Sequence, residues 1–449
     1  MNEKHEGSFL RSVLAIAVPV GLQSMLQSSF SMVDQLMVGQ LGSGAVAAVE
    51  VAGRPAFIYS VAVGAIAAIA GIMISQYLGM GDRALAYRSL WVNLTAAAAL
   101  ALVFFALSLL FPTELVGLFF KDGRDSLGPG RGYLLRIAWT YLPMGIASLL
   151  SVMIRCQGRA VWPLAAGLAS AAVNTCLNYG LIFGRWGLPA MGVLGAAWAS
   201  VISQGVNLLV ILIMFLRLQG KELPSFSLSL GREGRREYLW MLLPLLATEF
   251  LWSLGQSLNT FIYGHISNEA LAAMSITGPV QGLFTGALSG VSQAAGILIG
   301  KRLGAGDYDG ARRESVRLTW YGVAGALVLS ALLLLLRGPY VLLYRVEPEV
   351  QAGASALLAL FAILAPVKVT NMILGGGILR SGGRTAYIAV IDLLGTWLIG
   401  APLGLVTAFV LRLPVTWVYF ILSLEEVARL LMELRVFRGG RWMRTLSRH

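Results

Sequence analysis

The chain has 449 residues, of which 57% are hydrophobic and 12% are charged, and its formal net charge is +12. Average soluble domains carry roughly 25% charged residues, and the mean hydropathy of this chain is +0.75. The composition therefore excludes an ordinary soluble domain and indicates an integral membrane protein, so the basic excess does not by itself indicate nucleic-acid binding.

Apolar segments long enough to cross a bilayer, which takes about 20 residues, recur along the whole chain. They predict twelve helices, at approximately 12–38, 50–77, 88–112, 132–156, 160–184, 190–216, 236–262, 270–300, 314–336, 350–379, 385–410 and 413–434. We therefore expect an all-α integral membrane protein with twelve transmembrane helices.

The two halves of the chain repeat each other. The pentapeptide LGMGD begins at residue 78, and LGAGD begins at residue 303, which is 225 residues later. The same offset aligns further identical residues, among them Pro19 with Pro244, Arg88 with Arg313 and Arg155 with Arg380. A duplication of this length predicts two pseudo-symmetric six-helix bundles. We assign an N-lobe to residues 1–217, a linker to 218–236 and a C-lobe to 237–449.

Each repeated pentapeptide lies where the second helix of its half ends. Glycine readily adopts the left-handed backbone that terminates a helix, and aspartate caps the start of the next one. We therefore expect helix–turn–helix corners with left-handed glycines and with Asp82 and Asp307 as caps. A hinge role during conformational change is the alternative.

Cationic residues alternate between the predicted loops. Loops on one side are rich in them, including 217–236, the loops after both pentapeptides, and the C-terminal tail after residue 434. Loops on the other side contain far fewer. The positive-inside rule then places both termini in the cytoplasm. An even number of helices per half gives both halves the same orientation, with a ligand space expected between them.

The residues of soluble-enzyme chemistry are largely absent. The three histidines, His5, His265 and His449, are scattered, and Cys156 and Cys176 show no metal-site spacing. The segment GILIGKR at 296–302 departs from a nucleotide-binding loop and is better explained by helix packing through Gly296 and Gly300. We expect no enzyme activity, no catalytic residue and no cofactor.

Charged side chains inside the predicted spans are the informative exceptions. A charge at bilayer depth costs about 2.5–3.5 kcal/mol or more unless it faces a polar cavity or a partner. The acidic residues at such positions are Asp34, Glu50 at the start of the second helix, Glu249, Asp392, Glu425 and Glu426, and the cations are Arg136 and Lys368.

Asp34 is the strongest candidate for an ion-coupling site. It lies near the end of the first helix, and Asn174 and Asn178 share one face of the fifth helix because they are four residues apart. Ser200 lies about ten residues into the sixth predicted helix, which places it at about the same depth in the membrane as Asp34, Asn174 and Asn178. The oxygens of these four residues would suit a sodium ion or a shared proton, and a proton needs less negative charge than sodium. Hydrogen bonds between helices are the structural alternative.

Three further sites are expected in the C-terminal half. Glu249 follows Pro244, which frees backbone groups, and it is predicted to bind substrate or a proton; a structural partner is the alternative. Asp392 either contributes to this site or forms a neutral pair with Lys368. Glu425 and Glu426 are more simply explained by contact with Arg429 one turn further along the helix.

At these residues the chain resembles the multidrug and toxic compound extrusion (MATE) antiporters. The resemblance rests on VDQLMVGQLG at 33–42, ISQYLGMGD at 74–82, NTCLNYGLIFGRWGLPAMGVLGAAWAS at 174–200, EFLWSLGQSLNTFIYGHISNEALAAMS at 249–275 and GILRSGGRT at 377–385. It covers nearly the whole chain. It implies export of amphipathic, often cationic compounds in exchange for H⁺ or Na⁺, with Asp34, Asn174 and Asn178 at an ion site and Glu249 at a coupling position.

The sequence departs from the family pattern at two positions. Asn178 stands where some members have an acid, and QGRAVWP at 157–163 lacks the usual acid after Gly158. We therefore favour H⁺ over Na⁺ as the coupling ion. The expected partners are small organic substrates and membrane lipids, without nucleic acid, and the protein is expected to be a monomer in the plasma or inner membrane.

Two other functions remain open. A flippase for lipid-linked precursors, from the same broad superfamily, would need a cationic cleft for pyrophosphate, which Arg136 and Lys368 permit but the acidic residues disfavour. A passive channel would not need carboxylates buried in a duplicated scaffold. Ion flux stimulated by a ligand would separate these possibilities from an antiporter.

Overall fold

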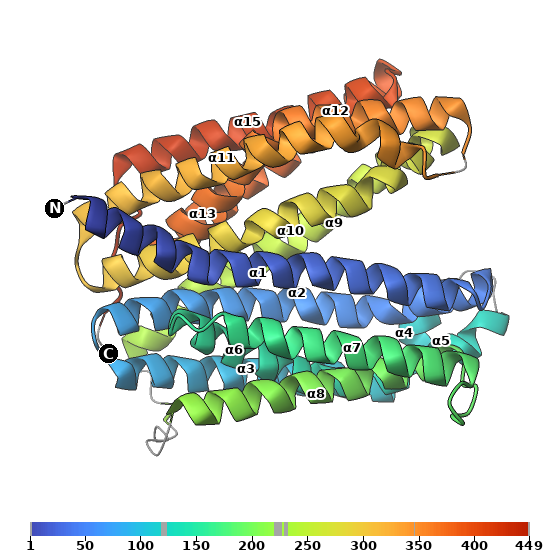
Figure 1. The fold of residues 1–449 in the computed structure, drawn as a ribbon, viewed down its shortest axis with the longest axis horizontal. Helices are drawn as coiled ribbons and strands as arrows, with labels where there is room; N and C mark the ends of the chain where they lie inside the picture. The colour runs from blue at the N-terminus through green and yellow to red at the C-terminus, as the bar shows by residue number, and fades with distance from the viewer. Residues whose placement is uncertain (1, 118–123, 220–226, 229–231, 345, 448–449) are drawn as a thin grey trace. The chain divides into compact units, whose positions relative to one another are not determined.

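The computed structural model describes residues 2–117, 124–219, 227–228, 232–344 and 346–447. In these ranges the regular secondary structure is entirely helical (Figure 1). Eleven helices among them are long and apolar enough to cross a membrane. The twelfth predicted segment is also a helix, Val415–Gly439, but it carries Glu425, Glu426 and Arg429 near its middle. The predicted fold class, a multi-pass helical membrane protein, is confirmed.

The first half of the chain contains six long helical segments. They are α1 (Asn2–Gly39), α2 (Ser43–Gly79), α3 (Arg83–Leu110), α5 (Arg124–Ile137) continued by η1 (Ala138–Thr140) and α6 (Tyr141–Cys156), α7 (Val161–Phe183) and α8 (Val193–Gln219), with the short α4 (Pro112–Gly117) between α3 and α5. The predicted start of the second helix was wrong. Glu50 lies inside α2, where it pairs with Arg54 on an exposed helix face.

The second half contains α9 (Arg232–Ile266), α10 (Asn268–Gly304), α11 (Tyr308–Val341), α12 (Pro348–Asn371) and α15 (Val415–Gly439). Between α12 and α15 the helices are interrupted. The segments there are η2 (Met372–Leu379), η3 (Arg380–Gly382), α13 (Thr385–Leu393), η4 (Leu394–Gly400), α14 (Ala401–Leu405) and η5 (Val406–Val410), of which η2, η4 and η5 are π-helical. Pi-helical turns are uncommon and often mark functional sites.

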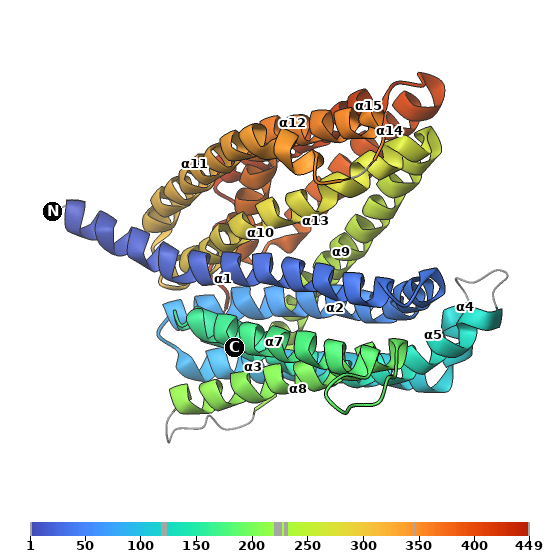
Figure 2. The same ribbon diagram turned by 45° about the vertical axis from the view of Figure 1, so that its right-hand side comes forward.

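The chain divides into two compact units. Unit 1 contains residues 1–21, 75–82 and 231–449, and unit 2 contains residues 22–74 and 83–230. The N-lobe of residues 1–217 and the C-lobe of 237–449 stay predictions, and most of the linker at 218–236 lies outside the described residues. Within unit 1, α11 and α12 lie side by side, and within unit 2 α7 and α8 do so (Figures 1 and 2).

The core of unit 2 is built from aliphatic and aromatic side chains. Tyr59 and Tyr141 are fully buried, and the Tyr59 hydroxyl donates a hydrogen bond to the Tyr141 carbonyl oxygen at 2.7 Å. A second cluster surrounds Leu134 and Ala197, which are also fully buried. Burial of both clusters fixes the helices that carry the polar residues described below.

The two repeated pentapeptides have turn and packing roles. Gly81 and Gly306 adopt left-handed backbone, with φ of +76° and +75°, and the Asp307 side chain caps α11 by accepting a hydrogen bond from the Gly310 amide at 2.8 Å. Gly79 and Gly304 instead end their helices without left-handed backbone, which corrects that expectation.

Gly79 and Gly304 permit a close helix crossing within unit 1. A Cβ at Gly79 would collide with the Lys301 backbone, and a Cβ at Gly304 would collide with the Gln76 backbone. A Cβ at Gly300 would collide with the Ser75 side chain. The repeated glycines therefore bring the ends of α2 and α10 into backbone contact, as small residues do in membrane helices.

The C-terminal tail completes this corner of unit 1. The fully buried Gln76 side chain donates through Nε2 to the carbonyl oxygens of Ser381 (2.7 Å) and Arg444 (3.1 Å), and its Oε1 accepts from the Leu446 amide at 2.8 Å. Trp442 is 1% exposed. The Gln76 side chain at the end of α2 thus hydrogen bonds to both η3 and the basic C-terminal tail.

Candidate functional site

The predicted ion-coupling residues form a polar cluster in unit 2. Asp34 lies five residues before the end of α1, and Asn174 and Asn178 lie on one face of α7. Asn178 is 2% exposed, and its Nδ2 donates to Asp34 Oδ1 at 2.7 Å and to Asn174 Oδ1 at 3.1 Å. The structure therefore brings all three side chains together, as their spacing predicted.

Of the two orientations of the Asn174 amide, the one that turns its nitrogen toward Asp34 satisfies both its nitrogen and its oxygen. In one, its nitrogen donates to the two carboxylate oxygens of Asp34 at 2.8 and 3.0 Å. In the other, its oxygen faces Asp34 and accepts from Asn178, while its nitrogen donates to Ser203 Oγ at 3.3 Å. Because two acceptors repel without a hydrogen between them, the second orientation fits a protonated Asp34.

The hydroxyl in this cluster belongs to Ser203, and Ser200 contributes differently from the prediction. Ser203 Oγ donates to the Ser200 carbonyl oxygen at 3.0 Å, and Ser170 Oγ on α7 donates to the Ser203 carbonyl oxygen at 2.7 Å. Ser200 therefore takes part through its backbone. Ser203 was not among the predicted residues. It lies one helical turn after Ser200 on α8 and on the same face of that helix.

The cluster contains one carboxylate and otherwise neutral groups. In the part of the chain that the structure describes, no three His, Cys, Asp or Glu side chains gather as a metal site would require. Asn178 Oδ1 is buried without a hydrogen-bond partner among these residues. A donor already occupies Asp34 Oδ1, so this arrangement offers a cation fewer oxygens than the sequence suggested.

The second candidate site is a cavity of about 940 Å³ within unit 1. Its walls come from α9, α10, α12, η2, α13, η4 and α15. The cavity walls contain hydrophobic, aromatic and polar side chains, including Trp252, Gln256, Tyr263, Gln281, Phe361 and Tyr419. Ligand pockets for small molecules have this size and this mixture of groups.

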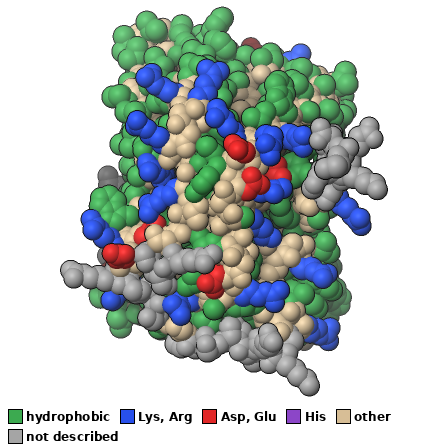
Figure 3. Space-filling view, turned by 90° about the vertical axis from the view of Figure 1, so that its left-hand side faces the viewer, with side chains coloured by type: hydrophobic (Ala, Val, Ile, Leu, Met, Phe, Trp, Pro, Cys, Tyr) green, Lys and Arg blue, Asp and Glu red, His purple; other side chains and the backbone are tan. Residues whose placement is uncertain are grey.

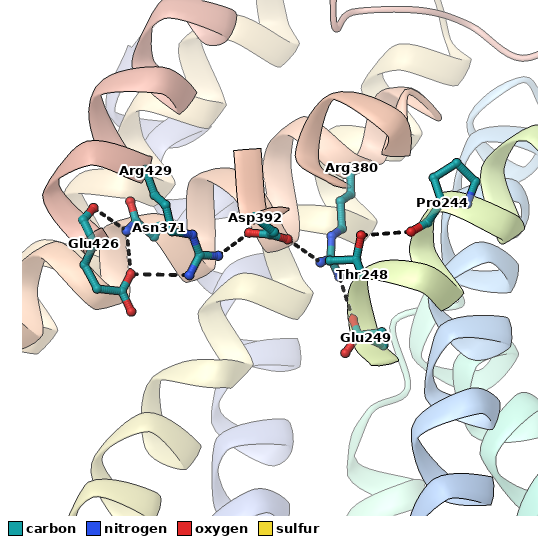
Figure 4. Close-up of polar contacts among 8 residues, drawn as sticks. All are labelled: Pro244, Thr248, Glu249, Asn371, Arg380, Asp392, Glu426 and Arg429. Carbon is teal, nitrogen blue, oxygen red and sulfur yellow. Dashed lines mark hydrogen bonds and ion pairs between the residues drawn. The ribbon is translucent and has the colours of Figure 1, made fainter. Parts of the chain in front are cut away.

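Five charged side chains of the cavity form an ion-pair chain. Arg380 Nη1 lies 3.3 Å from Glu249 Oε1, and Arg380 Nη2 lies 3.7 Å from Asp392 Oδ2. Arg429 binds Asp392 through Nη2 and approaches Glu426 Oε2 at 3.7 Å through Nη1. Figure 4 shows the ion-pair chain running from Glu426 through Arg429, Asp392 and Arg380 to Glu249.

Two polar side chains lie at the ends of the ion-pair chain. Asn371 Nδ2 donates to Glu426 Oε2 at 2.7 Å and to the Glu426 carbonyl oxygen at 2.8 Å. Thr248, next to Glu249, donates its hydroxyl hydrogen to the Pro244 carbonyl oxygen at 2.8 Å. These contacts are drawn in Figure 4; the Asn371 amide orients the Glu426 carboxylate, and the Thr248 hydroxyl satisfies a backbone oxygen of α9 one turn before it.

Glycines in the π-helical segments make room for the charged face of α15. Glu425, Arg429 and Glu433 are spaced by four residues and therefore lie on one face of the helix. A Cβ at Gly400 would meet Glu425, one at Gly395 would meet Arg429, and one at Gly375 would meet Glu433. The three glycines thus allow three charged side chains to enter a helix interface that larger residues would close.

The structure corrects the predicted partners of Asp392. Asp392 pairs with Arg380 and Arg429, and Lys368 forms no ion pair with any described residue. Glu426 meets Arg429, as predicted, whereas Glu425 does not. Lys368 and Glu425 both line the cavity instead.

Arg380 is the main residue of the cavity that the sequence analysis misplaced. It falls between the predicted helices 350–379 and 385–410, but its side chain is 18% exposed and pairs with two carboxylates. Its alignment with Arg155 in the repeat was a usable signal. Arg429 was expected as a partner of Glu425 and Glu426 alone, and Asn371 gave no signal.

Comparisons with known proteins agree with this fold over nearly the whole chain. The uncharacterized transporter YisQ of Bacillus subtilis is 24% identical over 439 residues, covering 96% of this chain and 95% of the relative. The probable multidrug resistance protein NorM of Rhizobium meliloti is 28% identical over 451 residues, covering 95% of this chain and 93% of the relative.

Solved structures show the same fold. The crystal structure of a mutant of the Vibrio cholerae MATE transporter VcmN has a TM-score of 0.86 at 17% identity, covering 97% of this chain and 99% of that chain. The MatE family model matches twice, at residues 19–180 and 244–406, and the two matches begin at the duplicated prolines Pro19 and Pro244. Because these matches cover more than half of its residues, the chain belongs to the MatE family of multidrug and toxic compound extrusion transporters.

Proposed function

We propose that the protein is a secondary active antiporter that exports amphipathic, cationic organic compounds in exchange for protons by alternating access. The observation that carries the coupling part of the proposal is the polar cluster of Asp34, Asn174 and Asn178. Family membership and the multidrug resistance names of several relatives support the transport of organic compounds.

Proton binding at Asp34 changes the hydrogen bonds of α7 and α8. The charged carboxylate accepts from the Asn174 nitrogen, and the protonated carboxyl donates to the Asn174 oxygen. The second state turns the Asn174 nitrogen toward Ser203 Oγ on α8. A proton on Asp34 therefore reverses the direction of the hydrogen bond between α1 and α7 and adds a hydrogen bond between α7 and α8.

Sodium is the less favourable coupling ion for this cluster. Sodium requires several oxygen ligands with enough negative charge to offset its dehydration, whereas Asp34 is the one carboxylate here among the described residues. A proton needs a single acceptor atom.

The cavity of unit 1 is proposed as the substrate site. Glu249 contacts Arg380 at the rather long distance of 3.3 Å and lines the cavity. A substrate cation that approaches Glu249 would compete with Arg380 for the carboxylate. Trp252 and Tyr263 supply aromatic walls for the apolar part of such a compound.

The distribution of cations supports a topology with both termini in the cytoplasm. The described ends of the chain, both in unit 1, lie at one end of its helices (Figure 1), and Lys and Arg side chains gather on the face seen in Figure 3. The positive-inside rule places such a face in the cytoplasm. We propose a monomer in the plasma or inner membrane.

The flippase alternative receives less support from the cavity. Pyrophosphate would need free cations, but Arg380 and Arg429 are both paired with carboxylates. Lys368 remains as the cavity cation without an ion pair among the described residues. One ammonium group offers little charge for a pyrophosphate.

The test is transport by purified protein in proteoliposomes. Wild-type protein and Asp34→Asn are compared for dye transport driven by a pH gradient without sodium, and then by a sodium gradient without a pH difference. We expect wild-type transport under the pH gradient and none by the variant. Transport that runs only on sodium would refute proton coupling, and a fully active Asp34→Asn would remove the site. Glu114→Gln, on the separate helix α4, is a matched control.

A further inference from the structure

The C-terminal tail, residues 440–447, is docked on unit 1 by apolar side chains. Trp442 and Leu446 are 1% and 4% exposed. Arg441 and Arg444, in contrast, are exposed. This division between buried apolar and exposed charged side chains is typical of a segment that packs against the rest of the protein through one side.

Polar contacts join the tail to three helices of unit 1. Thr445 Oγ1 donates to the Leu303 carbonyl oxygen at the end of α10 at 2.6 Å, and it lies 2.8 Å from the Tyr308 hydroxyl at the start of α11. Arg444 Nη2 forms an ion pair with Glu237 Oε1, near the start of α9, at 2.9 Å. The tail therefore bridges helix ends that are far apart in the sequence.

The tail also binds the last turn of α2. Gln76 is fully buried, and it exchanges hydrogen bonds with the Arg444 carbonyl oxygen and the Leu446 amide. Residues 43–74 of α2 belong to unit 2, whereas residues 75–79 belong to unit 1. The tail thus holds the one turn of this helix that belongs to unit 1.

The docked tail also makes burial of the Gln76 amide favourable. Without the tail, Gln76 Nε2 would keep only the Ser381 carbonyl oxygen, and Gln76 Oε1 would lose its donor. A buried polar atom that lacks a partner costs free energy, whereas water can satisfy the same atom when it is exposed. Undocking of the tail therefore favours an arrangement in which the end of α2 leaves α10 and Gln76 is hydrated.

We propose that the C-terminal tail is a latch for the crossing of α2 and α10: the docked tail keeps the two helix ends together, and its release lets them separate. This inference rests on the proposed alternating access. In that cycle, the helix ends that the proposed topology places in the cytoplasm separate when the protein opens to that side. Release of the tail then precedes or accompanies this opening.

Ser75 is a suitable position for a probe of the crossing. It is fully buried, and a Cβ at Gly300 on α10 would collide with its side chain. Ser75→Cys is made in a background without Cys156 and Cys176, and its reaction with N-ethylmaleimide is timed in purified protein without any ion gradient. Because this measurement needs neither substrate nor proton coupling, its failure is distinguishable from failure of the proposed antiport.

The expected result is faster labelling when the tail is removed. Truncation after Gly439 should raise the labelling rate of Ser75→Cys about tenfold, equivalent to ~1.4 kcal/mol in the opening equilibrium. A synthetic peptide with the sequence of residues 440–449 should slow the labelling of the truncated protein again. The same peptide with Trp442→Ala and Leu446→Ala should have no effect, because the side chains that dock it are gone.

Two controls separate the latch from a general loss of structure. Thr445→Val in the full chain should speed labelling about threefold, as expected for lost hydrogen bonds, whereas Ser447→Ala should keep the wild-type rate. Ser330→Cys lies on α11, 22 residues after the tail contact at Tyr308, and it is 6% exposed. Its labelling rate should be the same with and without the tail.

An unchanged rate at Ser75→Cys in a truncated protein that keeps its helical circular dichroism would overturn the proposal, because water would then replace the tail without any movement of α2. Equal acceleration at Ser330→Cys would overturn it as well. If the truncated protein does not fold, the full-length variants decide: labelling in Thr445→Val no faster than in Ser447→Ala would refute the latch.

Discussion

The contact between Gly395 and Arg429 provides a sharp test of how the cavity is held open. A Cβ at residue 395 would lie 2.6 Å from Arg429 Cδ and even closer to its Cγ. In Gly395→Ala, the Arg429 side chain must therefore move away from Asp392 and Glu426. We expect a loss of stability that comes from the ion-pair chain rather than from the helix that contains the mutation.

The size of the effect follows from two terms. Overpacking a filled interface costs about 1–3 kcal/mol, and removing one partner from a buried ion pair costs about 3–5 kcal/mol. Arg429 can relax in part, and Asp392 keeps Arg380 as a second partner. We therefore expect a destabilisation of roughly 2–4 kcal/mol, or roughly 4–8 °C in apparent melting temperature at about 2 °C per kcal/mol.

The assay is thermal unfolding of the purified protein in detergent, with a double-mutant cycle. In an Arg429→Ala background, Gly395→Ala should cost much less, because the Arg429 Cγ and Cδ atoms that collide with the new Cβ are gone. Gly278→Ala is the matched control, since a Cβ there meets nothing within 4 Å. This control should be neutral or more stable by about 0.5–1 kcal/mol. An unchanged melting temperature in Gly395→Ala, or an equal loss in both backgrounds, would refute the reasoning.

Three further predictions concern the substrate, the topology and the tail. Glu249→Gln should reduce affinity for cationic dyes about tenfold, as expected for a lost charged contact, and lower drug resistance at equal expression. Single cysteines at Ser225, which lies outside the described residues, and at Ser126 should react with an impermeant reagent from opposite sides of the membrane. Gln76→Ala should lower the melting temperature, because each of the buried backbone groups it leaves unpaired costs about 1–3 kcal/mol.

Each of these has an outcome that contradicts it. Unchanged resistance of Glu249→Gln to several cationic dyes would place the substrate-binding carboxylate elsewhere. Labelling of both cysteines from outside, in a background without Cys156 and Cys176, would overturn the topology. A Gln76→Ala protein as stable as Gln256→Ala, a glutamine that faces the cavity, would show that the tail contacts contribute little.

The sequence alone predicted the membrane class, the duplicated helices and the grouping of Asp34 with Asn174 and Asn178. These features depend on local rules: a bilayer sets the length of an apolar run, and residues four apart share a helix face. The same rules did not predict the contact of Ser203 with Asn174, because that contact depends on how α8 packs against α7.

The tertiary structure alone decided the partners of the charges in the second half. Sequence spacing suggested that Asp392 pairs with Lys368, yet Arg380 and Arg429 bind Asp392. This outcome depends on the π-helical turns and on Gly395, which let the Arg429 side chain pass between two helices. Neither feature has a regular period along the chain. Ion pairs between separate helices are determined by which side chains fit the space left by their neighbours, and sequence separation carries no information about that space.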